Sequence, residues 1–325
     1  MRQLYHGDLA LDADEDTETA VKPQVKPSVS AIVVTFKSGP RLKECLYALC
    51  VEKDISEIIV VNHGNDDFHT EWLENFRAPD HVHVEVLTGH GNIGYAAGIN
   101  LGAKKATGER YLIINPDAVI KYGSISALEN ARSKRNSPCL VGGKIMYSDG
   151  EEQRGGRREL MTPWRAFTTF TGLHVLEKYS QAFRNLHREK DPEPKGPVSM
   201  PVISGAFCYL TAEDFKLLGG LDESYFLHVE DIDICRRVWE KGGEVVYTPK
   251  ASALHYGSTS KVSASFVEWN KAKGLARYFF VNAKTVVGKV FAKLSILAFA
   301  PLLLFRSFAI RMLQQVRESL RKLVS

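Results

Sequence analysis

Residues 30–35 read SAIVVT and residues 57–61 read EIIVV, two apolar runs that are rich in β-branched side chains. Such runs are typical of strands that are covered on both faces, as in parallel sheets. The segment 40–50 between them predicts a helix. Two more strands are predicted over 81–87 and over 111–114, with a glycine-punctuated helix between them that ends near Gly108. This alternation predicts an α/β fold with a mostly parallel sheet flanked by helices.

The pattern changes at about residue 150. Residues 150–200 are charged and rich in Gly and Pro, and we expect a helix over 164–184 inside an insertion or flexible loop that lies over the site and contacts the acceptor. Regular structure is predicted to resume with a strand over 202–210, a helix over 212–218, a helix from Glu230 to Gly242, and a strand over 244–247. One domain over 28–275 accounts for these elements.

The two ends of the chain differ in charge. Residues 1–27 are acidic, polar and proline-punctuated, which predicts a disordered leader without a signal peptide. Residues 276–325 predict amphipathic helices that associate with a membrane. The apolar run 294–305 is shorter than the roughly 20 residues that span a bilayer, so we expect the tail to lie on the lipid surface. Docking of the tail on its own domain or on a second subunit is the alternative.

Two sets of residues at helical spacing carry this prediction. The apolar set is Phe308, Met312, Val316, Leu320 and Leu323, and the basic set is Arg306, Arg311, Arg317, Arg321 and Lys322. A basic amphipathic helix of this kind suits anionic lipid. Because the basic residues accompany apolar ones and not aromatic stacking platforms, nucleic acid is not expected as a partner.

The cysteines indicate the compartment. Five are present in 325 residues, and they have no metal-like spacing and lie mostly within apolar runs. Buried free thiols of this kind are typical of a reducing compartment. We therefore expect a cytoplasmic protein, peripheral on the inner face of the cell membrane.

Asn115, Pro116 and Asp117 directly follow the strand over 111–114. A carboxylate at this position can reach a divalent cation that neutralises a diphosphate. The alternative is an ordinary turn, because Asn-Pro-Asp is favourable turn chemistry. His255 is a second potential ligand of the same cation, since imidazole suits manganese better than magnesium, and its alternative is a structural role.

Glycines recur in the segment 91–108, with Gly91, Gly94, Gly98 and Gly102 among them. Glycines at a helix N-terminus let the backbone approach a phosphate-bearing ligand closely. The segment does not match the dinucleotide-binding fingerprint, since the acidic residue expected at the end of the second strand is Asn62. Close helix packing, with Gly108 as C-cap, is the alternative.

Three carboxylates, those of Glu230, Asp231 and Asp233, open one predicted helix. Acidic residues are favoured in the first turn of a helix, which explains one or two of them. Adjacent carboxylates that enter a cleft can instead supply the general base that takes a proton from an acceptor hydroxyl.

In this order, these segments resemble the bacterial family 2 glycosyltransferases of the GT-A fold, above all the rhamnosyltransferase-like branch. The resemblance runs from about residue 30 to residue 260. It is carried by SAIVVTFKSGP, EIIVVNHGNDD, GNIGYAAGINLGAKKATGERYLIINPDA, GGKIMYSDGEEQRGGRR, the stretch from SGAFCYL to HVEDIDICRRVWEKGG, and LHYGSTS.

The resemblance implies an inverting transfer of a sugar from a nucleotide-diphosphate donor to a lipid-linked or polysaccharide acceptor in cell-surface glycan synthesis. Polyprenyl-diphosphate-linked sugars are the expected lipid acceptors, and Mn²⁺ or Mg²⁺ is the expected cofactor. L-rhamnose from dTDP-rhamnose is the first expectation, followed by UDP-linked hexoses and galactofuranose. A homo-oligomer is possible. A sugar-phosphate nucleotidyltransferase and a non-catalytic membrane-associated subunit are the competing functions.

The resemblance also implies a role for each site residue. Asp231 is the expected base, assisted by Glu230, and Asp117 and His255 are the expected metal ligands. The acceptor is expected to contact Asp233, Arg157 and Arg158. The donor is expected to contact Thr35, Lys37, Asn62, Asp66, Asn92, Gly94, Tyr95, Asn100 and Asn115. This chain has VNHGN where the family usually has VDNGS, so the identity of the nucleotide stays open.

Overall fold

The computed structural model describes residues 28–257 and 262–324, and in the last helix it describes side chains as far as Phe305, together with Phe308 and Met312. The expected leader over 1–27 therefore lies outside the described residues, as does part of the LHYGSTS segment.

Eleven strands form two sheets in this part of the chain. Their bounds are β1 (Val29–Thr35), β2 (Ile55–Asn62), β3 (His83–Leu87), β4 (Arg110–Ile114), β5 (Ala118–Ile120), β6 (Cys139–Met146), β7 (Arg157–Arg158), β8 (Val198–Ser199), β9 (Val202–Ile203), β10 (Phe207–Thr211) and β11 (Glu244–His255).

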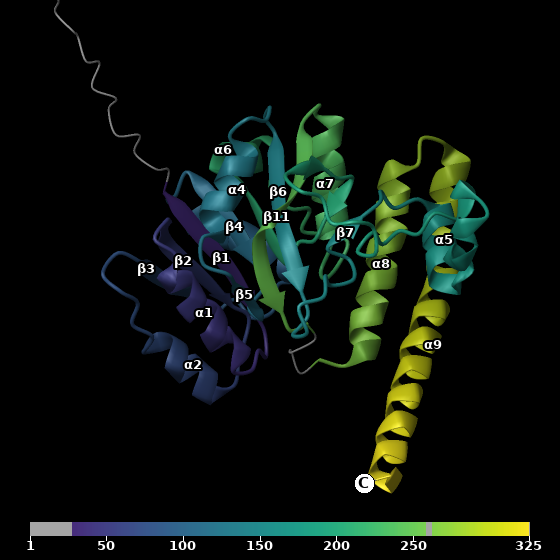
Figure 1. Ribbon diagram of the computed structural model, residues 1–325, viewed down its shortest axis with the longest axis horizontal. Helices are drawn as coiled ribbons and strands as arrows, with labels where there is room; N and C mark the ends of the chain where they lie inside the picture. Colours follow the sequence, from purple (N-terminus) through teal and green to yellow (C-terminus); the bar gives the residue numbers. More distant parts are fainter. Residues whose placement is uncertain (1–27, 258–261, 325) are drawn as a thin grey trace, which may run out of the picture.

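The bounds of the described helices are α1 (Arg41–Val51), α2 (Asp67–Glu74), α3 (Tyr95–Lys105), α4 (Ser124–Arg132), α5 (Pro163–Thr171), α6 (Ala212–Leu217), α7 (Glu230–Glu240), α8 (Ala264–Asn282) and α9 (Val286–Val324), with the short 3-10 helices η1 (Leu173–Lys178) and η2 (Gln181–Phe183). Most of the described helices flank the main sheet, whereas α5, α8 and α9 lie together on one side of it (Figure 1).

The main sheet has the order β3-β2-β1-β4-β10-β6-β11-β5, and β8 pairs with β11. The strands β3, β2, β1, β4, β6 and β11 run in one direction, whereas β10, β5 and β8 run in the other. The prediction of an α/β fold with a mostly parallel sheet is therefore confirmed. Because strands of one direction end at one edge, the loops after β1, β2 and β4 meet there.

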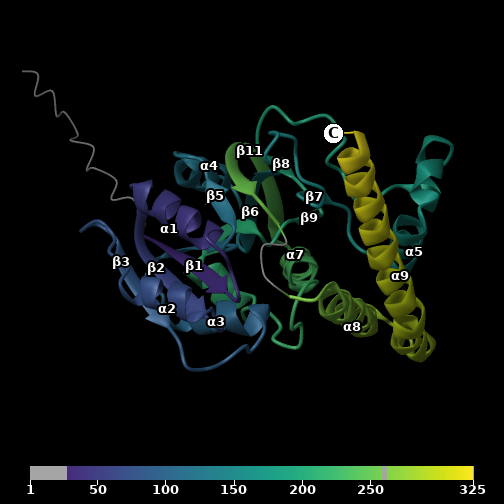
Figure 2. The ribbon, with the colours of Figure 1, turned by 90° about the horizontal axis from the view of Figure 1, so that it is seen from below.

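Both faces of the sheet are buried, as the apolar runs predicted. Along β1, Ala31 and Val33 pack with α1, α2 and α4, whereas Ile32 and Val34 pack with α3, α6 and α7. This alternation is the period of two that a strand imposes on its side chains. The apolar cluster that contains Ile32 and Val34 continues through α8 to α9. These two helices lie side by side beyond α7 (Figures 1 and 2).

The glycines of α3 allow this helix to pack closely on the sheet. A Cβ at Gly102 would lie 2.6 Å from Cγ2 of Ile32, and a Cβ at Gly98 would lie 3.0 Å from both methyl groups of Val34. The close-packing interpretation is thus confirmed for these two positions. The expected C-cap at Gly108 is wrong, because the C-cap is Ala106 and Gly108 lies against the backbone of Ser30.

Three predicted elements differ from the observed ones. The helix expected over 164–184 is only α5 followed by two 3-10 turns, because Gly172 adopts a φ of +84°. The strand expected over 202–210 is divided into β9 and β10 by a turn at residues 204–206. The strand expected over 244–247 continues through a register shift as far as His255, although Pro249 lies within it.

The C-terminal helix α9 is longer than the tail sequence suggested. Its segment Val286–Phe305 is 20 residues long and has a mean hydropathy of 1.8, which is long and apolar enough to cross a membrane by length and composition alone. The expectation counted only residues 294–305 and found them too short to span a bilayer. The apolar helical segment is longer than that, so this expectation of length is wrong. Phe308 and Met312 are exposed, as expected. The side chains of Arg306, Arg311, Val316, Arg317, Leu320, Arg321, Lys322 and Leu323 lie outside the described residues.

Candidate active site

The ends of β1, β2 and β4 lie next to one another in the sheet. Thr35 pairs with Asn62 across β1 and β2, and Val33 pairs with Ile114 at the end of β4. Directly beside these ends lies a cavity of about 410 Å³. Of the residues expected in the site, the cavity is lined by Tyr95, Asn115, Arg158, Glu230, Asp231 and His255.

Asp117 and His255 lie together, although 138 positions separate them in the sequence. Oδ1 of Asp117 is 3.2 Å from Nε2 of His255, because β5 and the end of β11 pair in the sheet. Asn115 joins them through Nδ2, which lies 3.2 Å from the same Nε2. Asp117 is buried, with 5% of its surface exposed. The strand pairing that the sequence did not predict therefore creates this cluster.

Gln153 fixes the orientation of the His255 ring. Its Oε1 lies 2.5 Å from Nδ1 of His255, and its Nε2 donates to the His255 carbonyl oxygen at 3.2 Å. An amide oxygen can only accept, so Nδ1 carries the proton and the lone pair of a neutral ring is on Nε2, toward Asp117. A carboxylate and an oriented imidazole nitrogen fit a divalent cation whose other ligands are phosphate oxygens and water.

Over residues 28–257 and 262–324, no three His, Cys, Asp or Glu side chains gather as a possible metal site. A cation held here would thus depend on Asp117, His255 and the substrate together.

Asp231 is held in the cavity by three donors. Its Oδ2 accepts from Nη2 of Arg158 at 2.5 Å and from the backbone N–H of Gly205 at 3.2 Å, while Oδ1 accepts from the N–H of Ile232 at 2.8 Å. Burial opposes its ionisation, but the charge and hydrogen bond of Arg158 lower the pKa of the carboxyl below its usual value. Asp231 is therefore ionised and fixed in position at neutral pH.

Glu230, the neighbour of Asp231, is in the opposite state. It is 8% exposed, and its Oε2 is buried without a hydrogen-bond partner among the described residues. Burial and the charge of Asp231 raise the pKa of Glu230 to about 8. Adjacent carboxyls whose pKa values are pushed apart are typical of sites that divide acid and base roles.

The protonated state of Glu230 predicts a pH dependence of stability. Between pH 4.5 and about 8 the unfolded chain releases a proton that the folded protein keeps. The free energy of unfolding should therefore fall as pH rises through this interval, by at most about 1.4 kcal/mol per pH unit. Glu230→Gln should remove this contribution, so the variant gains stability relative to the natural protein between pH 5 and pH 8.

Urea unfolding at several pH values measures this difference. Glu240→Gln is the matched control, because Glu240 lies at the other end of α7 with 56% of its side chain exposed. A constant difference between Glu230→Gln and the natural protein from pH 5 to pH 8 would contradict a protonated Glu230.

The backbone that leads into α7 is strained. His228 and Val229 have φ values of +68° and +77°, which residues other than Gly rarely adopt. Such outliers cluster at functional sites. The two residues line the cavity and place Glu230 and Asp231 at its wall. Burial first, and then the charge of Lys271, lower the pKa of His228 to about 4, so its ring is neutral.

The residues expected to hold the base and ribose of the donor form a hydrogen-bonded group around Asn65. Asn65 Nδ2 donates to Oδ1 of Asn62 at 2.9 Å and to Oγ1 of Thr35 at 3.1 Å. The backbone N–H of Lys37, whose φ is +48°, donates to the Gly64 carbonyl oxygen at 3.1 Å. Asp66 caps α2. This arrangement fixes the two loops relative to each other.

Tyr95 links the start of α3 to the metal-site loop. Its hydroxyl donates to Oδ1 of Asn115 at 3.0 Å and lies 3.3 Å from the carbonyl oxygen of Gly205. Gly94, with a φ of +93°, is the N-cap of α3, and its N–H donates to Oδ1 of Asn92 at 3.1 Å. A Cβ at Gly94 would lie 2.9 Å from Phe226, so this position requires glycine.

Three expected site residues make other contacts and are not among the residues that line the cavity. Nδ2 of Asn100 donates to the carbonyl oxygen of Leu221 at 2.8 Å, and Oδ1 of Asn100 accepts from the N–H of Leu221 at 2.9 Å. Arg157 is 4% exposed and pairs with Glu152 at 2.8 Å. The third, Asp233, pairs with two arginines of α7.

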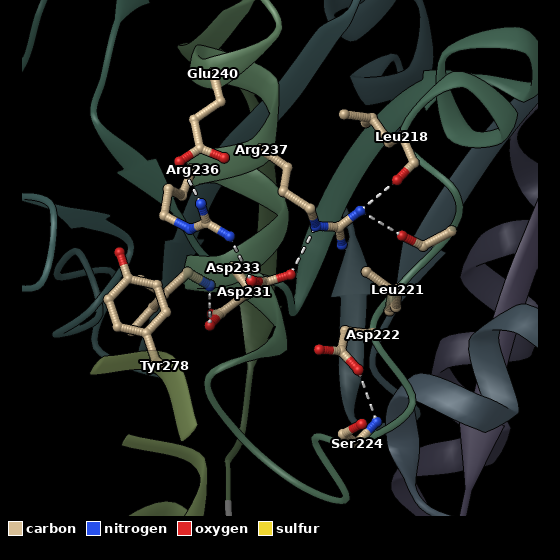
Figure 3. A network of polar contacts seen from close by, with 12 residues as sticks. Leu218, Leu221, Asp222, Ser224, Asp231, Asp233, Arg236, Arg237, Glu240 and Tyr278 are labelled. Atoms are coloured by element: carbon tan, nitrogen blue, oxygen red, sulfur yellow. Dashed lines mark hydrogen bonds and ion pairs between the residues drawn. The ribbon is translucent and has the colours of Figure 1, made fainter. Parts of the chain in front are cut away.

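Asp233 belongs to a network that fastens α7 to the preceding loop (Figure 3). It accepts from Arg236 at 3.2 Å and from Arg237 at 2.7 Å, and Arg237 also donates to the carbonyl oxygens of Leu218 and Gly220. Residues two apart on a helix face different sides. Asp233 therefore cannot share the cavity with Asp231.

Several residues around the site were not predicted from the sequence. Gln153, Gly205, His228, Asn65 and Lys271 contact or line it. Gly205, Gln153, His228 and Asn65 stand in segments that carry the family resemblance, and this was the available signal. Lys271 lies on α8 outside these segments, so nothing in its local sequence marks it.

The family model of glycosyl transferase family 2 matches residues 30–204. N-acetylglucosaminyl-diphospho-decaprenol L-rhamnosyltransferase of Mycobacterium tuberculosis is 26% identical over 252 residues, which are 70% of this chain and 76% of the relative. Rhamnosyltransferase WbbL of Escherichia coli is 24% identical over 236 residues, 61% of this chain and 82% of the relative.

Solved structures resemble the fold. GalNAc-T7, crystallised with UDP, GalNAc and Mn²⁺, superposes with a TM-score of 0.52 at 15% identity. The superposition covers 71% of this chain and 43% of that one. Residues 1–349 of S. aureus TarS superpose with a TM-score of 0.50 at 13% identity over 83% of this chain and 69% of that one.

Proposed function

The chain belongs to glycosyl transferase family 2, and on this premise we propose that it transfers a sugar, with inversion, from a nucleotide-diphosphate donor to a lipid-linked or polysaccharide acceptor. The observation that carries the proposal is the shared cavity. An ionised Asp231 lines the same cavity as Asn115 and His255, which lie beside the buried Asp117. A base and a cation-binding pair are thus placed around one space that is large enough for a sugar.

The proposed chemistry is a single displacement. Asp231 takes the proton of an acceptor hydroxyl while the oxygen attacks the anomeric carbon of the donor sugar from the side opposite the leaving diphosphate. Glu230, which is protonated near neutral pH, can donate a hydrogen bond to the acceptor beside Asp231. Catalysis then depends mainly on positioning and on electrostatic stabilisation.

Asp117 and His255 are the residues that would hold a divalent cation, and Asn115 would contact the same group. When bound, Mn²⁺ or Mg²⁺ stabilises the negative charge of the leaving diphosphate. GalNAc-T7 was solved with Mn²⁺, which supports manganese as the first ion to test. Gln153 contributes by accepting from Nδ1 of His255, which leaves Nε2 of the ring for the cation.

The donor and acceptor are proposed from the relatives. The mycobacterial relative and WbbL are both rhamnosyltransferases, so dTDP-rhamnose is the first donor that we propose. The name of the mycobacterial relative describes a sugar-diphospho-decaprenol acceptor. A polyprenyl-diphosphate-linked sugar is accordingly the first acceptor, and synthesis of a cell-surface polysaccharide is the process.

A thermal-shift screen of the full chain tests the donor site. Melting temperatures with dTDP, UDP and GDP are compared with and without Mn²⁺, because a ligand that binds the native state stabilises it by mass action. One nucleotide should raise the melting temperature, and only with the metal. No shift with any nucleotide would favour a non-catalytic subunit.

The tail provides the proposed membrane contact. On the first turns of α9, Val286, Phe291, Leu297 and Phe305 are between 68% and 79% exposed. Lys284, Lys289 and Lys293 accompany them, and no acidic residue lies between 283 and 312. This composition suits anionic lipid. The protein is then peripheral on the inner face of the cell membrane, or anchored there through the apolar segment of α9.

Two substitutions on the exposed face of α9 test this contact without removing the helix. Phe291→Ser with Leu297→Ser should weaken binding to phosphatidylglycerol vesicles at least about tenfold, because each side chain gains about 1.5–3 kcal/mol on full burial in lipid. Vesicle sedimentation measures the binding. Val281→Ser on α8, at a position 47% exposed, is the control. Unchanged sedimentation of the double variant would show that this face is not the contact.

A further inference from the structure

Three basic side chains line the cavity, and the proposed transfer uses only Arg158 among them, as the partner that holds Asp231. Arg154, Arg158 and Lys271 line the cavity together with Glu230 and Asp231. They come from three parts of the chain: the loop before β7, β7 itself and α8. Glu230 and Asp231 are the two carboxyl side chains among the residues that line the cavity.

Arg158 has donors that Asp231 does not use. Its Nη2 bonds Asp231 and the Ile203 carbonyl oxygen, the latter at 2.8 Å. Its Nε is buried and has no hydrogen-bond partner among the described residues. A guanidinium group has five N–H donors in a planar fork that matches phosphate oxygens. The side chain lines the cavity and is 12% exposed, so a ligand in the cavity can reach the exposed part of the guanidinium group.

Lys271 lines the cavity together with Arg158 and, like Arg158, acts on His228. After burial, its charge is the largest cause of the lowered pKa of His228, and Arg158 acts on His228 in the same direction. The two cations therefore converge on one region of the wall. The neutral His228 adds no charge there, but its ring can still donate or accept a hydrogen bond.

The wall next to these cations is apolar. Met161, Phe170, Leu186 and Leu275 line the same cavity. Phe170 in turn packs on Phe299 of α9, with ring centroids 5.9 Å apart, so α5 connects the cavity with the helix that we propose lies on the membrane. A molecule with a phosphate joined to a hydrocarbon chain matches both parts of the wall.

We propose that Arg158 and Lys271 form a phosphate subsite that binds the phosphate or diphosphate of a lipid-linked acceptor, with the apolar wall receiving the start of its hydrocarbon chain. This inference rests on the proposed function for the identity of the acceptor. It assigns the discrimination between lipid-linked and free glycans to these two residues. The subsite differs from the donor diphosphate site, which we place at Asp117 and His255.

Direct binding tests the subsite without requiring transfer. The full chain in detergent is titrated with farnesyl diphosphate and with farnesol, and nucleotide affinity is measured with Mn²⁺ in parallel. Farnesyl diphosphate should bind at least about tenfold more tightly than farnesol. Lys271→Met should reduce its affinity about tenfold and leave nucleotide affinity unchanged. Lys273→Met, the same substitution at an exposed position of α8, should change neither.

Each other outcome is also informative. Equal binding of farnesyl diphosphate and farnesol, or an unchanged affinity in Lys271→Met, would overturn the subsite. A loss of nucleotide affinity in Lys271→Met would overturn it as well, because the lysine would then serve the donor. Inorganic pyrophosphate that binds as tightly as farnesyl diphosphate would support the phosphate subsite and exclude the hydrocarbon contact. Absence of transfer with every donor would refute the proposed function and leave these binding results valid.

Discussion

Asp231→Asn is expected to lower kcat by roughly 10²–10⁴-fold, the usual contribution of a general base. The amide keeps the shape of the side chain and can still accept from Arg158 and Gly205, but it cannot take a proton. The binding of donor nucleotide should stay within about twofold of the natural protein, because Asp231 contacts no residue that we assign to the donor. Transfer kinetics and nucleotide titration on the same preparation measure both quantities.

A matched control separates the loss of a base from the loss of an ion pair. Asp222 also pairs with an arginine, Arg277, at 2.7 Å, but it does not line the cavity. Asp222→Asn should therefore cost some stability and leave kcat nearly unchanged. If Asp231→Asn turned over at the normal rate, Asp231 would not be the base, and Glu230 in its ionised form would be the next residue to test.

Asp117→Ala is expected to abolish the metal-dependent binding of nucleotide and to lower transfer by two orders of magnitude or more, since a bound cation contributes several kcal/mol of charge stabilisation. The reason is that Asp117 is the one carboxylate beside His255 in the metal pair described above. The melting temperature of the variant should no longer rise when nucleotide and Mn²⁺ are added together.

Asp117→Asn distinguishes this role from that of a turn residue. Asparagine is also favourable in turns, so a structural role predicts that Asn restores what Ala loses. A ligand role predicts that both variants lose the Mn²⁺-dependent shift, because the charge is absent in each. A normal Mn²⁺ response in Asp117→Asn would show that the residue serves the turn alone.

The local pattern of the sequence determined the first half of the fold. The β-branched runs over 30–35 and 57–61 predicted β1 and β2 within one or two residues. The reason is that a strand buried on both faces must be apolar at every position, and this requirement is visible in the sequence itself. The acidic start of α7 and the Asn-Pro-Asp turn after β4 were found in the same way, because each combines short-range chemistry with the end of an element.

Long-range pairing decided the rest. β10 and β11 enter the sheet between or beside strands that are distant in sequence, and only the pairing of β11 with β5 brings His255 to Asp117. No local pattern records which strands become neighbours. The strained turn at His228 and Val229 and the contact of Gln153 with His255 likewise depend on surrounding structure.

The sequence alone thus determined the α/β class, the parallel strands and the carboxylates and histidine that could carry chemistry, because these depend on residue type and on spacing within a few turns. The tertiary structure alone decided which of them act together. Asp231 and Asp233 are the same residue type, two positions apart in the first turn of α7. The rotation of 100° per residue along the helix places Asp231 in the cavity and Asp233 against Arg236 and Arg237. Arg158 became a site residue, and Arg157 did not, because neighbouring residues of β7 face opposite sides of the strand.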